Sequence, residues 1–273
     1  MKKRISLTID NDILKRLDEL VDEINTRSRS EAIESIVRNH LKGNKTAVFL
    51  GGGNLESLKI DDEFKPLIKI SGKSLIEYNM SELKKNGFSK IFFIGKSELI
   101  GECFKIVGDG ENFGVDVTYI EEKKTLGNAK TLQLIQNHVN QPFLVLPVDN
   151  YFSFDLGGMV KRHMSETPLA TLAVQASRGY STELGIVEMA GDKIINYEEK
   201  PNNPKTFLTA LFIGIYSPEI FDYIPKGDLK WILQRDIFPK IIHEKDLNGY
   251  IISGISVNID SKKDIQIIKN LLK

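Results

Sequence analysis

The sequence predicts an α/β protein built of two units: a small strand–helix–helix unit over residues 1–42 and a large unit over residues 46–273, joined by a linker over residues 43–45. Three observations predict this arrangement. In the small unit, apolar residues first alternate with polar ones and then recur at helical spacing. Beyond the linker, strand patterns alternate with helical patterns, which is typical of a mainly parallel sheet that helices cover on both faces. The length of 273 residues suits one small and one large domain.

The composition excludes several classes of protein. Hydrophobic residues make up 41% and charged residues 27% of the chain, which predicts a folded, soluble protein rather than a disordered one. The single cysteine, Cys103, excludes an intrachain disulfide and a cysteine-based zinc site. No apolar run reaches the roughly 20 residues of a membrane helix, and residues 1–10 do not form a signal peptide. We therefore expect a cytoplasmic protein without a membrane partner.

The small unit should begin with a strand and continue with two helices. Polar and apolar residues alternate over residues 4–9, and apolar residues recur at helical spacing over residues 13–24 and 32–41. Between the helices, Ser28-Arg29-Ser30-Glu31 has the form of a capping box. A unit of this size cannot bury its apolar faces alone, and a lone strand has two unpaired edges. We therefore expect a homodimer in which two strands pair, and the pattern leaves open whether dimers associate further.

The order of strand, helix, capped turn and helix resembles the ribbon-helix-helix family of DNA-binding proteins (Arc- and MetJ-like). The resemblance implies that two paired strands enter the major groove of double-stranded DNA. It also implies the DNA contacts: Arg4, Ser6 and Thr8 at base edges, and Ser28, Arg29 and Ser30 near phosphate. Residues 1–45 hold ten Lys or Arg against eight Asp or Glu, a small excess that supports this interpretation weakly. The alternative is a dimerisation arm with a solvated basic tip.

The large unit should begin with an apolar strand that runs into Gly51-Gly52-Gly53. Strand and helix patterns then alternate along the chain. The expected strands cover residues 46–50, 91–94, 115–120, 143–148 and 170–175, and the expected helices cover residues 74–86, 128–137 and 156–164. Residues 185–189, 193–197 and 211–216 favour the strands of an antiparallel extension, and a last helix should follow Asp260.

Three features of this unit favour a phosphate-containing ligand. A glycine run directly after a strand can hold phosphate on backbone N–H groups. Asp149 follows an apolar strand, at the edge where open α/β sheets bind ligands. Asp260 lies far along the chain, and two such carboxylates can hold one divalent metal together with substrate phosphates. Taken singly, each carboxylate is equally well explained as the cap of a turn or a helix.

In this order, these features resemble the sugar-phosphate nucleotidyltransferase family. The most specific segments are Phe64-Lys65-Pro66-Leu67, the strand that ends in Asp149, and Glu198-Glu199-Lys200-Pro201. The resemblance implies a Rossmann-like sheet, an NTP and a sugar 1-phosphate as substrates, and Mg²⁺ held by Asp149 and Asp260. It implies a ligand site that consists of Leu50, Gly51, Gly52, Lys65, Gly127, Asn128, Asp149, Glu199 and Lys200. Leu50, Gly51 and Gly127 would line the nucleobase pocket, Glu199 and Lys200 would hold the sugar and its phosphate, and Lys65 would meet phosphate and be the catalytic residue of an active enzyme.

The first loop departs from that family. The family's loop reads Gly-Gly-x-Gly-Thr-Arg, and its arginine clamps the departing pyrophosphate, whereas residues 51–57 here read Gly-Gly-Gly-Asn-Leu-Glu-Ser. Loss of such a charge clamp is expected to cost roughly 10³–10⁵ in rate, by analogy with an arginine finger. Glu121 also stands where family members tend to carry a base-reading glutamine, and a carboxylate lacks the amide donor.

These observations favour a transcriptional regulator that binds DNA through its small unit and binds a nucleotide or NDP-sugar as effector through its large unit, with little or no catalysis. One alternative is an active nucleotidyltransferase, which makes NDP-sugar and pyrophosphate, with a DNA-binding or dimerisation arm. Another is a structural protein whose large unit only sets the geometry of an oligomer. We expect DNA binding to need no cofactor, and Mg²⁺ to strengthen binding of a phosphorylated ligand.

Overall fold

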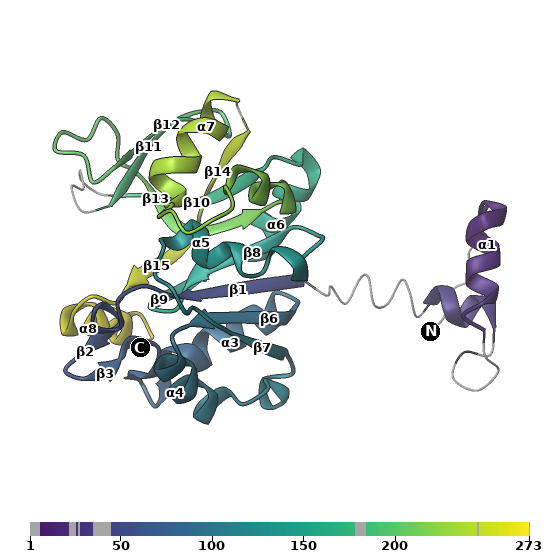
Figure 1. Ribbon diagram of the computed structural model, residues 1–273, viewed down its shortest axis with the longest axis horizontal. Coiled ribbons are helices and arrows are strands. Elements are labelled where there is room, and N and C mark those ends of the chain that lie inside the picture. The colour runs from purple at the N-terminus through teal and green to yellow at the C-terminus, as the bar shows by residue number, and fades with distance from the viewer. Residues whose placement is uncertain are drawn as a thin grey trace. The chain divides into compact units, whose positions relative to one another are not determined.

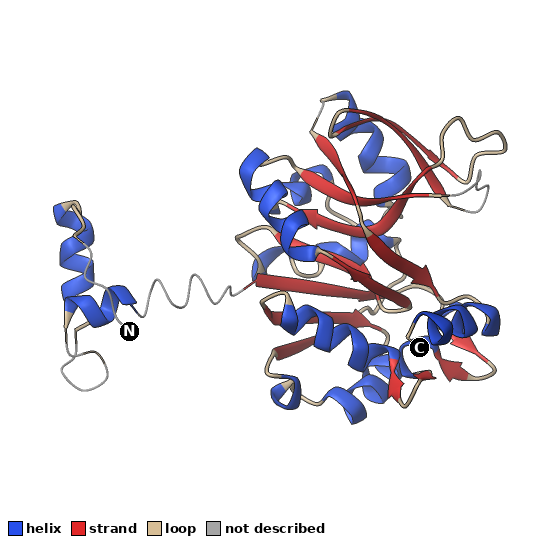
Figure 2. Cartoon of the chain, turned by 180° about the vertical axis from the view of Figure 1, so that it is seen from behind, coloured by secondary structure: helices blue, strands red, loops and turns tan. Residues whose placement is uncertain are grey.

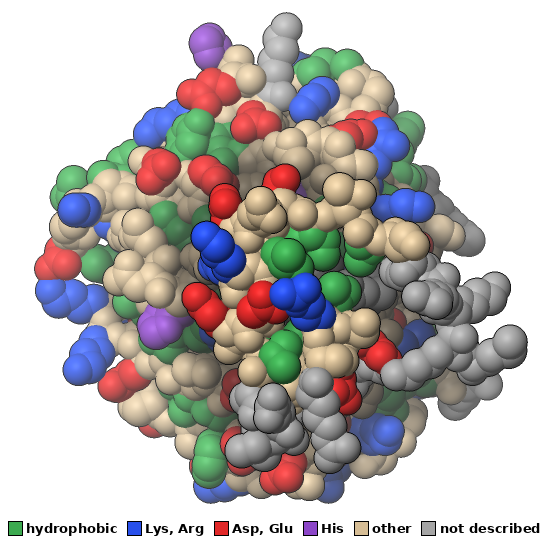
Figure 3. Space-filling model, turned by 90° about the vertical axis from the view of Figure 1, so that its right-hand side faces the viewer, with side chains coloured by type: hydrophobic (Ala, Val, Ile, Leu, Met, Phe, Trp, Pro, Cys, Tyr) green, Lys and Arg blue, Asp and Glu red, His purple; other side chains and the backbone are tan. Residues whose placement is uncertain are grey.

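The computed structural model describes residues 6–21, 26, 28–34, 45–177, 184–244 and 246–272. The chain divides into two compact units, Met1–Asn44 and Lys45–Lys273, and Figure 1 colours the first purple and the second from blue to yellow. The first strand of the large unit starts at Lys45, the last residue of the predicted linker. Charged side chains of both signs are interspersed on the face drawn in Figure 3, in keeping with the net charge of zero.

The small unit contains helices at both predicted places. α1 spans Asn11–Asp18, and residues 29–34 are helical. The Ser28 hydroxyl accepts a hydrogen bond from the Glu31 backbone N–H at 3.2 Å. A Ser side chain that satisfies the third N–H of a helix is an N-cap, so the predicted helix start is confirmed at Ser28.

The predicted strand of the small unit, residues 4–9, has no strand pairing over its described part, residues 6–9. A two-stranded ribbon is held by hydrogen bonds between two copies, so a single chain cannot form it alone. Leu7, Ile13 and Leu20 are 58%, 53% and 52% exposed. Large apolar side chains exposed to this extent on one small unit support a partner chain, and the dimer stays a prediction.

A nine-stranded sheet forms the centre of the large unit, in the order β10-β14-β12-β11-β13-β8-β1-β6-β7. Its strands are β1 (Lys45–Gly51), β6 (Phe88–Gly95), β7 (Asp116–Glu121), β8 (Phe143–Pro147), β10 (Ala170–Ala176), β11 (Gly185–Ala190), β12 (Lys193–Glu199), β13 (Leu208–Tyr216) and β14 (Leu247–Ile251). β1 pairs in parallel with β6 and β8, and β7 pairs in parallel with β6, whereas β13 joins β8 antiparallel. The predicted α/β class, with a parallel half and an antiparallel extension, is confirmed.

One further pairing closes the antiparallel end of the sheet. β10 pairs with β13 in addition to β14. β10, β14, β12, β11 and β13 thereby form a ring of paired strands. Because β13 also pairs with β8, the ring is continuous with the parallel half. Among the described strands, β7 is left as the open edge of the nine-stranded sheet.

Helices pack around this sheet (Figure 2). They are α3 (Leu75–Lys85), α4 (Ser97–Val107), α5 (Asn128–Gln133), α6 (Leu156–Glu166), α7 (Phe238–His243) and α8 (Lys262–Leu271). Successive residues of β1 enter two different apolar cores: Ala47 and Phe49 lie in one, Val48 and Leu50 in the other. A strand that is buried on both faces in this way belongs to a sheet with cover on both sides, as predicted. Among the described residues, no helix is long and apolar enough to cross a membrane.

Three pairs of shorter strands lie outside the main sheet. They are β2 (Lys59–Ile60) with β3 (Glu63–Phe64), β4 (Lys69–Ile70) with β5 (Lys73–Ser74), and β9 (Asn150–Phe154) with β15 (Gly254–Asn258). The predicted helix over residues 128–137 is shorter, because α5 ends at Gln133 and a 3-10 turn, Gln136–His138, follows. α4 was not predicted from the sequence.

Candidate ligand-binding site

The predicted carboxylates meet because two strands that are distant in sequence pair. Asn258, at the end of β15, lies opposite Asn150, at the start of β9. The Ile259 N–H donates a hydrogen bond to the Asp149 carbonyl oxygen at 2.9 Å. This pairing places Asp149, which follows β8, and Asp260, which precedes α8, beside one pocket.

That pocket, called the larger pocket below, has a volume of about 410 Å³. Asp149, Glu199, Lys200 and Asp260 line it, so these predicted site residues share one cavity. Its other polar side chains include Gln175, Ser177, Tyr197, Thr209, Gln234 and Ser256. Hydroxyl and amide groups both donate and accept hydrogen bonds, so the larger pocket is suited to a polar ligand such as a sugar phosphate.

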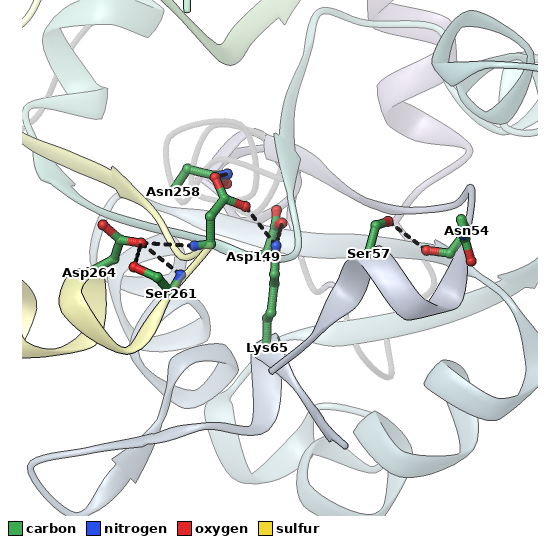
Figure 4. Close-up of polar contacts among 8 residues, drawn as sticks. Asn54, Ser57, Lys65, Asp149, Asn258, Ser261 and Asp264 are labelled. Carbon is green, nitrogen blue, oxygen red and sulfur yellow. Dashed lines mark hydrogen bonds and ion pairs between the residues drawn. The ribbon is translucent and has the colours of Figure 1, made fainter. Parts of the chain in front are cut away.

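Lys65 joins the two carboxylates (Figure 4). Its Nζ lies 3.2 Å from Asp149 Oδ2 and 2.8 Å from Asp260 Oδ1. The side chains of Lys65 and Asp149 are 6% and 13% exposed, whereas that of Asp260 is 68% exposed. Lys65 begins a 3-10 turn with Pro66, whose ring restricts the backbone and so limits where the lysine side chain can start.

Burial and charge act on these three groups in opposite directions. Burial alone would lower the pKa of Lys65, but hydrogen bonding and charge from Asp260 and Asp149 raise it above the ordinary value. Burial raises the pKa of Asp149, although Lys65 opposes the rise. Burial would also raise the pKa of Asp260, but hydrogen bonds from Lys65 and Asn258 outweigh it and lower that pKa. The ammonium form of Lys65 is therefore stabilised between its two partners.

A cap of α8 fixes the loop that carries Asp260. Asp264 Oδ2 accepts hydrogen bonds from the backbone N–H groups of Asp260 at 3.1 Å and Ser261 at 2.8 Å. Asn258 Nδ2 donates to Asp260 Oδ2 at 2.6 Å. Neither Asn258 nor Asp264 was predicted as a site residue from the sequence. The spacing of Ser261 and Asp264, with an acidic residue three after a hydroxyl residue, was the signal that indicates the cap.

The resemblance implies Mg²⁺ at Asp149 and Asp260, and the donors around these groups do not fit that ion. Mg²⁺ needs octahedral oxygen ligands at about 2.0–2.1 Å. Here the Lys65 ammonium bonds one oxygen of each carboxylate, and an amide N–H of Asn258 bonds the other oxygen of Asp260. In the part of the chain that the structure describes, no group of three or more His, Cys, Asp or Glu side chains could hold a metal.

A second, smaller pocket of about 130 Å³ lies next to the larger one, since Phe212 lines both. The predicted residues that line the smaller pocket are Leu50, Gly52, Gly127 and Asn128. Gly51 is not among its lining residues. It ends β1, where an added side chain would meet Leu99 at 2.7 Å and Val148 at 3.0 Å. We therefore correct the prediction for Gly51, which packs within the sheet.

Glu122, and not Glu121 as predicted, lines the smaller pocket. Glu121 is the exposed last residue of β7, whereas Glu122 is 2% exposed. Glu122 follows the end of β7, where the alternation of strand faces no longer decides which side chain turns inward. Glu122 accepts hydrogen bonds from the Gly53 N–H at 2.8 Å and from the Thr131 hydroxyl, and Lys96 Nζ lies 3.3 Å from it.

The loop after the glycine run closes on itself. Leu55–Leu58 form a 3-10 helix, and Leu58 is 7% exposed and packs in the core. The Glu56 side chain is 72% exposed and forms an ion pair with Lys59 at 2.8 Å. The Gly53 N–H, a donor that a glycine loop offers to phosphate, is already bonded. The loop thus presents an acidic side chain, and it has one backbone N–H fewer to offer to phosphate, because that of Gly53 is bonded to Glu122.

Glu199 and Lys200 also line the larger pocket. The Tyr197 hydroxyl donates a hydrogen bond to the Glu199 carboxylate. Burial raises the pKa of Tyr197, and the bond to Glu199 adds to the rise, so this hydroxyl keeps its proton. Lys200 has φ +47°, a left-handed conformation that few non-glycine residues adopt. Tyr197 was not predicted as a site residue, although it lies two residues before Glu199 and hence on the same face of β12.

The predicted DNA-contacting residues lie in the small unit. Those that the structure describes are all exposed: Ser6, Thr8, Ser28, Arg29 and Ser30. Arg4 lies outside the described residues. Arg29 Nε lies 2.5 Å from Asp18 Oδ1, and Arg29 Nη2 lies 2.8 Å from Asp18 Oδ2. The Asp18 carboxylate therefore accepts both hydrogen bonds of the Arg29 guanidinium, which could otherwise bind a phosphate in the same way. This contact was not predicted.

Two family matches cover most of the chain. Residues 47–255 match the nucleotidyl transferase family. Residues 3–42 match the ribbon-helix-helix protein, copG family. Both resemblances drawn from the sequence are thereby confirmed.

The similar proteins are sugar-phosphate nucleotidyltransferases by name. A UTP–glucose-1-phosphate uridylyltransferase of Synechocystis sp. is 31% identical over 194 residues, which are 65% of this chain and 50% of that protein. A glucose-1-phosphate thymidylyltransferase of Streptomyces antibioticus is 24% identical over 216 residues, 76% of this chain and 60% of that protein. The chain thus spans only part of these relatives. A Bacillus anthracis protein assigned as a glucose-1-phosphate thymidylyltransferase, in a crystal structure with sucrose, has a TM-score of 0.75 and 26% identity over 83% of this chain and 94% of its own.

Proposed function

The chain belongs to the nucleotidyl transferase family, and from this premise we propose that it is a DNA-binding transcriptional regulator. In this proposal the small unit binds double-stranded DNA as a dimer. The large unit binds a nucleotide or NDP-sugar as effector, with little or no turnover. The observation that carries the proposal is the altered loop after the glycine run.

That loop lacks what nucleotidyl transfer requires. The reaction depends on positioning and on stabilisation of developing negative charge. Here the loop has no arginine, its Glu56 side chain is paired with Lys59, and the Gly53 N–H donates to Glu122. Losing a contact made in the transition state weakens catalysis more than it weakens binding. We therefore expect ligand binding with a rate lower by roughly 10³–10⁵ than that of an enzyme with the arginine.

The two pockets support a nucleotide-sugar as the effector. The larger pocket presents polar groups around Glu199 and Lys200, and the smaller pocket is lined by Leu50, Gly127 and Phe212. We assign the sugar and its phosphate to the larger pocket and the base to the smaller one. The names of the relatives, which refer to uridylyl and thymidylyl transfer to glucose 1-phosphate, support UDP-glucose and dTDP-glucose as the first ligands to test.

The small unit supplies the DNA-binding half of the proposal. We assign Arg4, Ser6 and Thr8 to base edges and Ser28, Arg29 and Ser30 to phosphate contacts. The exposed apolar side chains of Leu7, Ile13 and Leu20 support association of two copies. An effector regulates DNA binding only if it binds the DNA-competent and DNA-incompetent arrangements with different affinity.

A gel-shift titration of the full chain on a selected DNA site, with and without UDP-glucose or dTDP-glucose, tests the proposal. We expect the effector to change DNA affinity by at least about fivefold, the lower range of allosteric coupling. Lys200→Ala is the matched variant, because it should remove the response to the effector while DNA affinity in its absence stays the same. DNA binding that no nucleotide or NDP-sugar changes would contradict the effector role.

One observation favours an active enzyme as the second candidate. Asp149 and Asp260, the two carboxylates that the resemblance requires, both line the larger pocket, and Lys65 contacts both. Pyrophosphate release from NTP and glucose 1-phosphate separates the two candidates. Turnover well above background that Asp149→Ala abolishes would establish the enzyme. If neither turnover nor ligand-induced thermal stabilisation is found, the large unit is a structural scaffold.

A further inference from the structure

We propose that the Lys65 ammonium is the resident cation of the Asp149–Asp260 pair, and that it keeps divalent metal ions off these carboxylates in the free protein. The proposal concerns the protein before any ligand binds, so it holds or fails independently of the regulator proposal. It rests on the positions of four side chains at the edge of the larger pocket.

The first step is steric. Lys65 Nζ lies within hydrogen-bond distance of Asp149 Oδ2 and Asp260 Oδ1, at 3.2 Å and 2.8 Å. A divalent ion that bridged the same two oxygens would need to lie at about 2.0–2.1 Å from each, for Mg²⁺, and hence close to the place that Nζ takes. The lysine side chain is only 6% exposed, so it has little room to move aside into solvent.

The second step concerns the remaining oxygen of Asp260. Asn258 Nδ2 donates to Asp260 Oδ2 at 2.6 Å. Both oxygens of Asp260 therefore accept hydrogen bonds from nitrogen donors, one charged and one neutral. The backbone of this loop is held by Asp264, so Asp260 is presented in this arrangement by the cap of α8. Donors on both oxygens stabilise the carboxylate without a metal.

The third step is the charge balance. Asp149 and Asp260 carry two negative charges, and Lys65 neutralises one of them. Glu199 and Lys200 line the same pocket and carry opposite charges, so Lys65 is the cation that contacts the two aspartates. Under the proposed function, the ligand's phosphate would meet Lys200 at the pocket wall, while Lys65 stays with the carboxylates.

The fourth step predicts what removal of the lysine does. Asp149 is 13% exposed, and a buried carboxylate that loses its partner is strongly destabilising. In Lys65→Met the two carboxylates would face one another across an apolar side chain. A divalent cation then becomes the partner that restores the balance, so the variant should gain a metal site that the natural chain lacks.

Binding of Mn²⁺ alone, measured by calorimetry and by the EPR signal of free Mn²⁺, tests this with the full chain. We expect the natural chain to bind Mn²⁺ weakly, and Lys65→Met to bind it at least about tenfold more tightly. Lys65→Met/Asp149→Asn should lose the gained site. Lys69→Met, at an exposed lysine on β4, is the matched control and should behave like the natural chain.

Thermal melting keeps the test decisive if Lys65→Met is poorly folded in chelator. Mn²⁺ should then raise the melting temperature of Lys65→Met and leave the natural chain and the double variant unchanged. Tight Mn²⁺ binding by the natural chain that Asp149→Asn abolishes would overturn the proposal. So would a Lys65→Met variant that binds Mn²⁺ no better than the natural chain, or that Mn²⁺ fails to stabilise.

Discussion

Gly127 lies where one added methyl group would strike the backbone of another segment. Its φ is +90° and its ψ is 159°, a conformation that is essentially restricted to glycine. A Cβ at this position would lie 2.3 Å from the Trp231 carbonyl oxygen. The two segments are joined by hydrogen bonds from the Trp231 N–H to the Leu126 oxygen at 2.8 Å and from the Ala129 N–H to the Trp231 oxygen at 3.3 Å.

Gly127→Ala should therefore destabilise the large unit by two additive effects. Backbone strain at this φ and ψ costs about 1–3 kcal/mol. Moving Trp231 away breaks at least one hydrogen bond, which costs about 0.5–1.5 kcal/mol. The sum, about 1.5–4.5 kcal/mol, corresponds to a melting temperature lower by roughly 3–18 °C for a domain of this size. The same movement should distort the smaller pocket that Gly127 lines.

Differential scanning calorimetry of the full chain measures this effect, and Gly72→Ala is its control. Gly72 has φ +95°, and an added Cβ there meets nothing within 4 Å. Gly72→Ala should show backbone strain alone, so the difference between the two variants reports the collision with Trp231. Equal losses of stability in the two variants would refute the reasoning, because the collision would then contribute nothing.

The remaining predictions concern pH, DNA and assembly. His163 is 1% exposed, and burial lowers its pKa to about 4. The unfolded state therefore takes up the proton first, so the free energy of unfolding should fall by roughly 3 kcal/mol as the pH drops from about 6.5 toward 4. His163→Gln should flatten that part of the pH dependence measured by urea unfolding. Asp18→Asn frees the Arg29 guanidinium, so DNA affinity should rise and the salt dependence should steepen by up to about one unit per protomer, whereas an unchanged gel-shift series would argue against Arg29 at phosphate. Deleting residues 1–44 should lower the number of subunits measured by light scattering, and an unchanged number would mean that the large unit assembles by itself.

Helices and strands could be predicted from the sequence where packing against the sheet makes apolar residues recur at a regular spacing. β1 shows this, since Phe49 and Val48 enter opposite cores and both must be apolar. α4 was missed, although its buried residues Leu99, Cys103 and Val107 are spaced four apart and carry the helical signal. A paired ribbon in the small unit stays a prediction, because its hydrogen bonds would belong to two chains.

The site was less predictable, because the pairing of strands that are distant in sequence leaves no regular spacing of residues in the sequence. Asp149 and Asp260 meet through the pairing of β9 with β15, and the resemblance, not the spacing, brought them together in the prediction. Glu122 was missed by one residue because β7 ends at that point, where alternation no longer decides which side chain turns inward. The contact of Asp18 with Arg29 depends on how the two helices of the small unit pack, which neither helix pattern specifies.

β10, β14, β12, β11 and β13 form a closed ring of paired strands, and all of them except β14 carry residues that line the larger pocket. A strand at the edge of an open sheet separates when one ladder of hydrogen bonds breaks, whereas each strand of the closed ring must break two. Slow exchange of backbone amide hydrogens should therefore extend around all five strands of the ring. The ring is weakly paired at one place, because β12 and β14 are joined through a single residue pair, Lys193 with Asn248. The buried Asn248 Oδ1 at this place has no hydrogen-bond partner. We therefore expect any opening of this ring to begin between β12 and β14, the pair on the opposite side of the ring from β13.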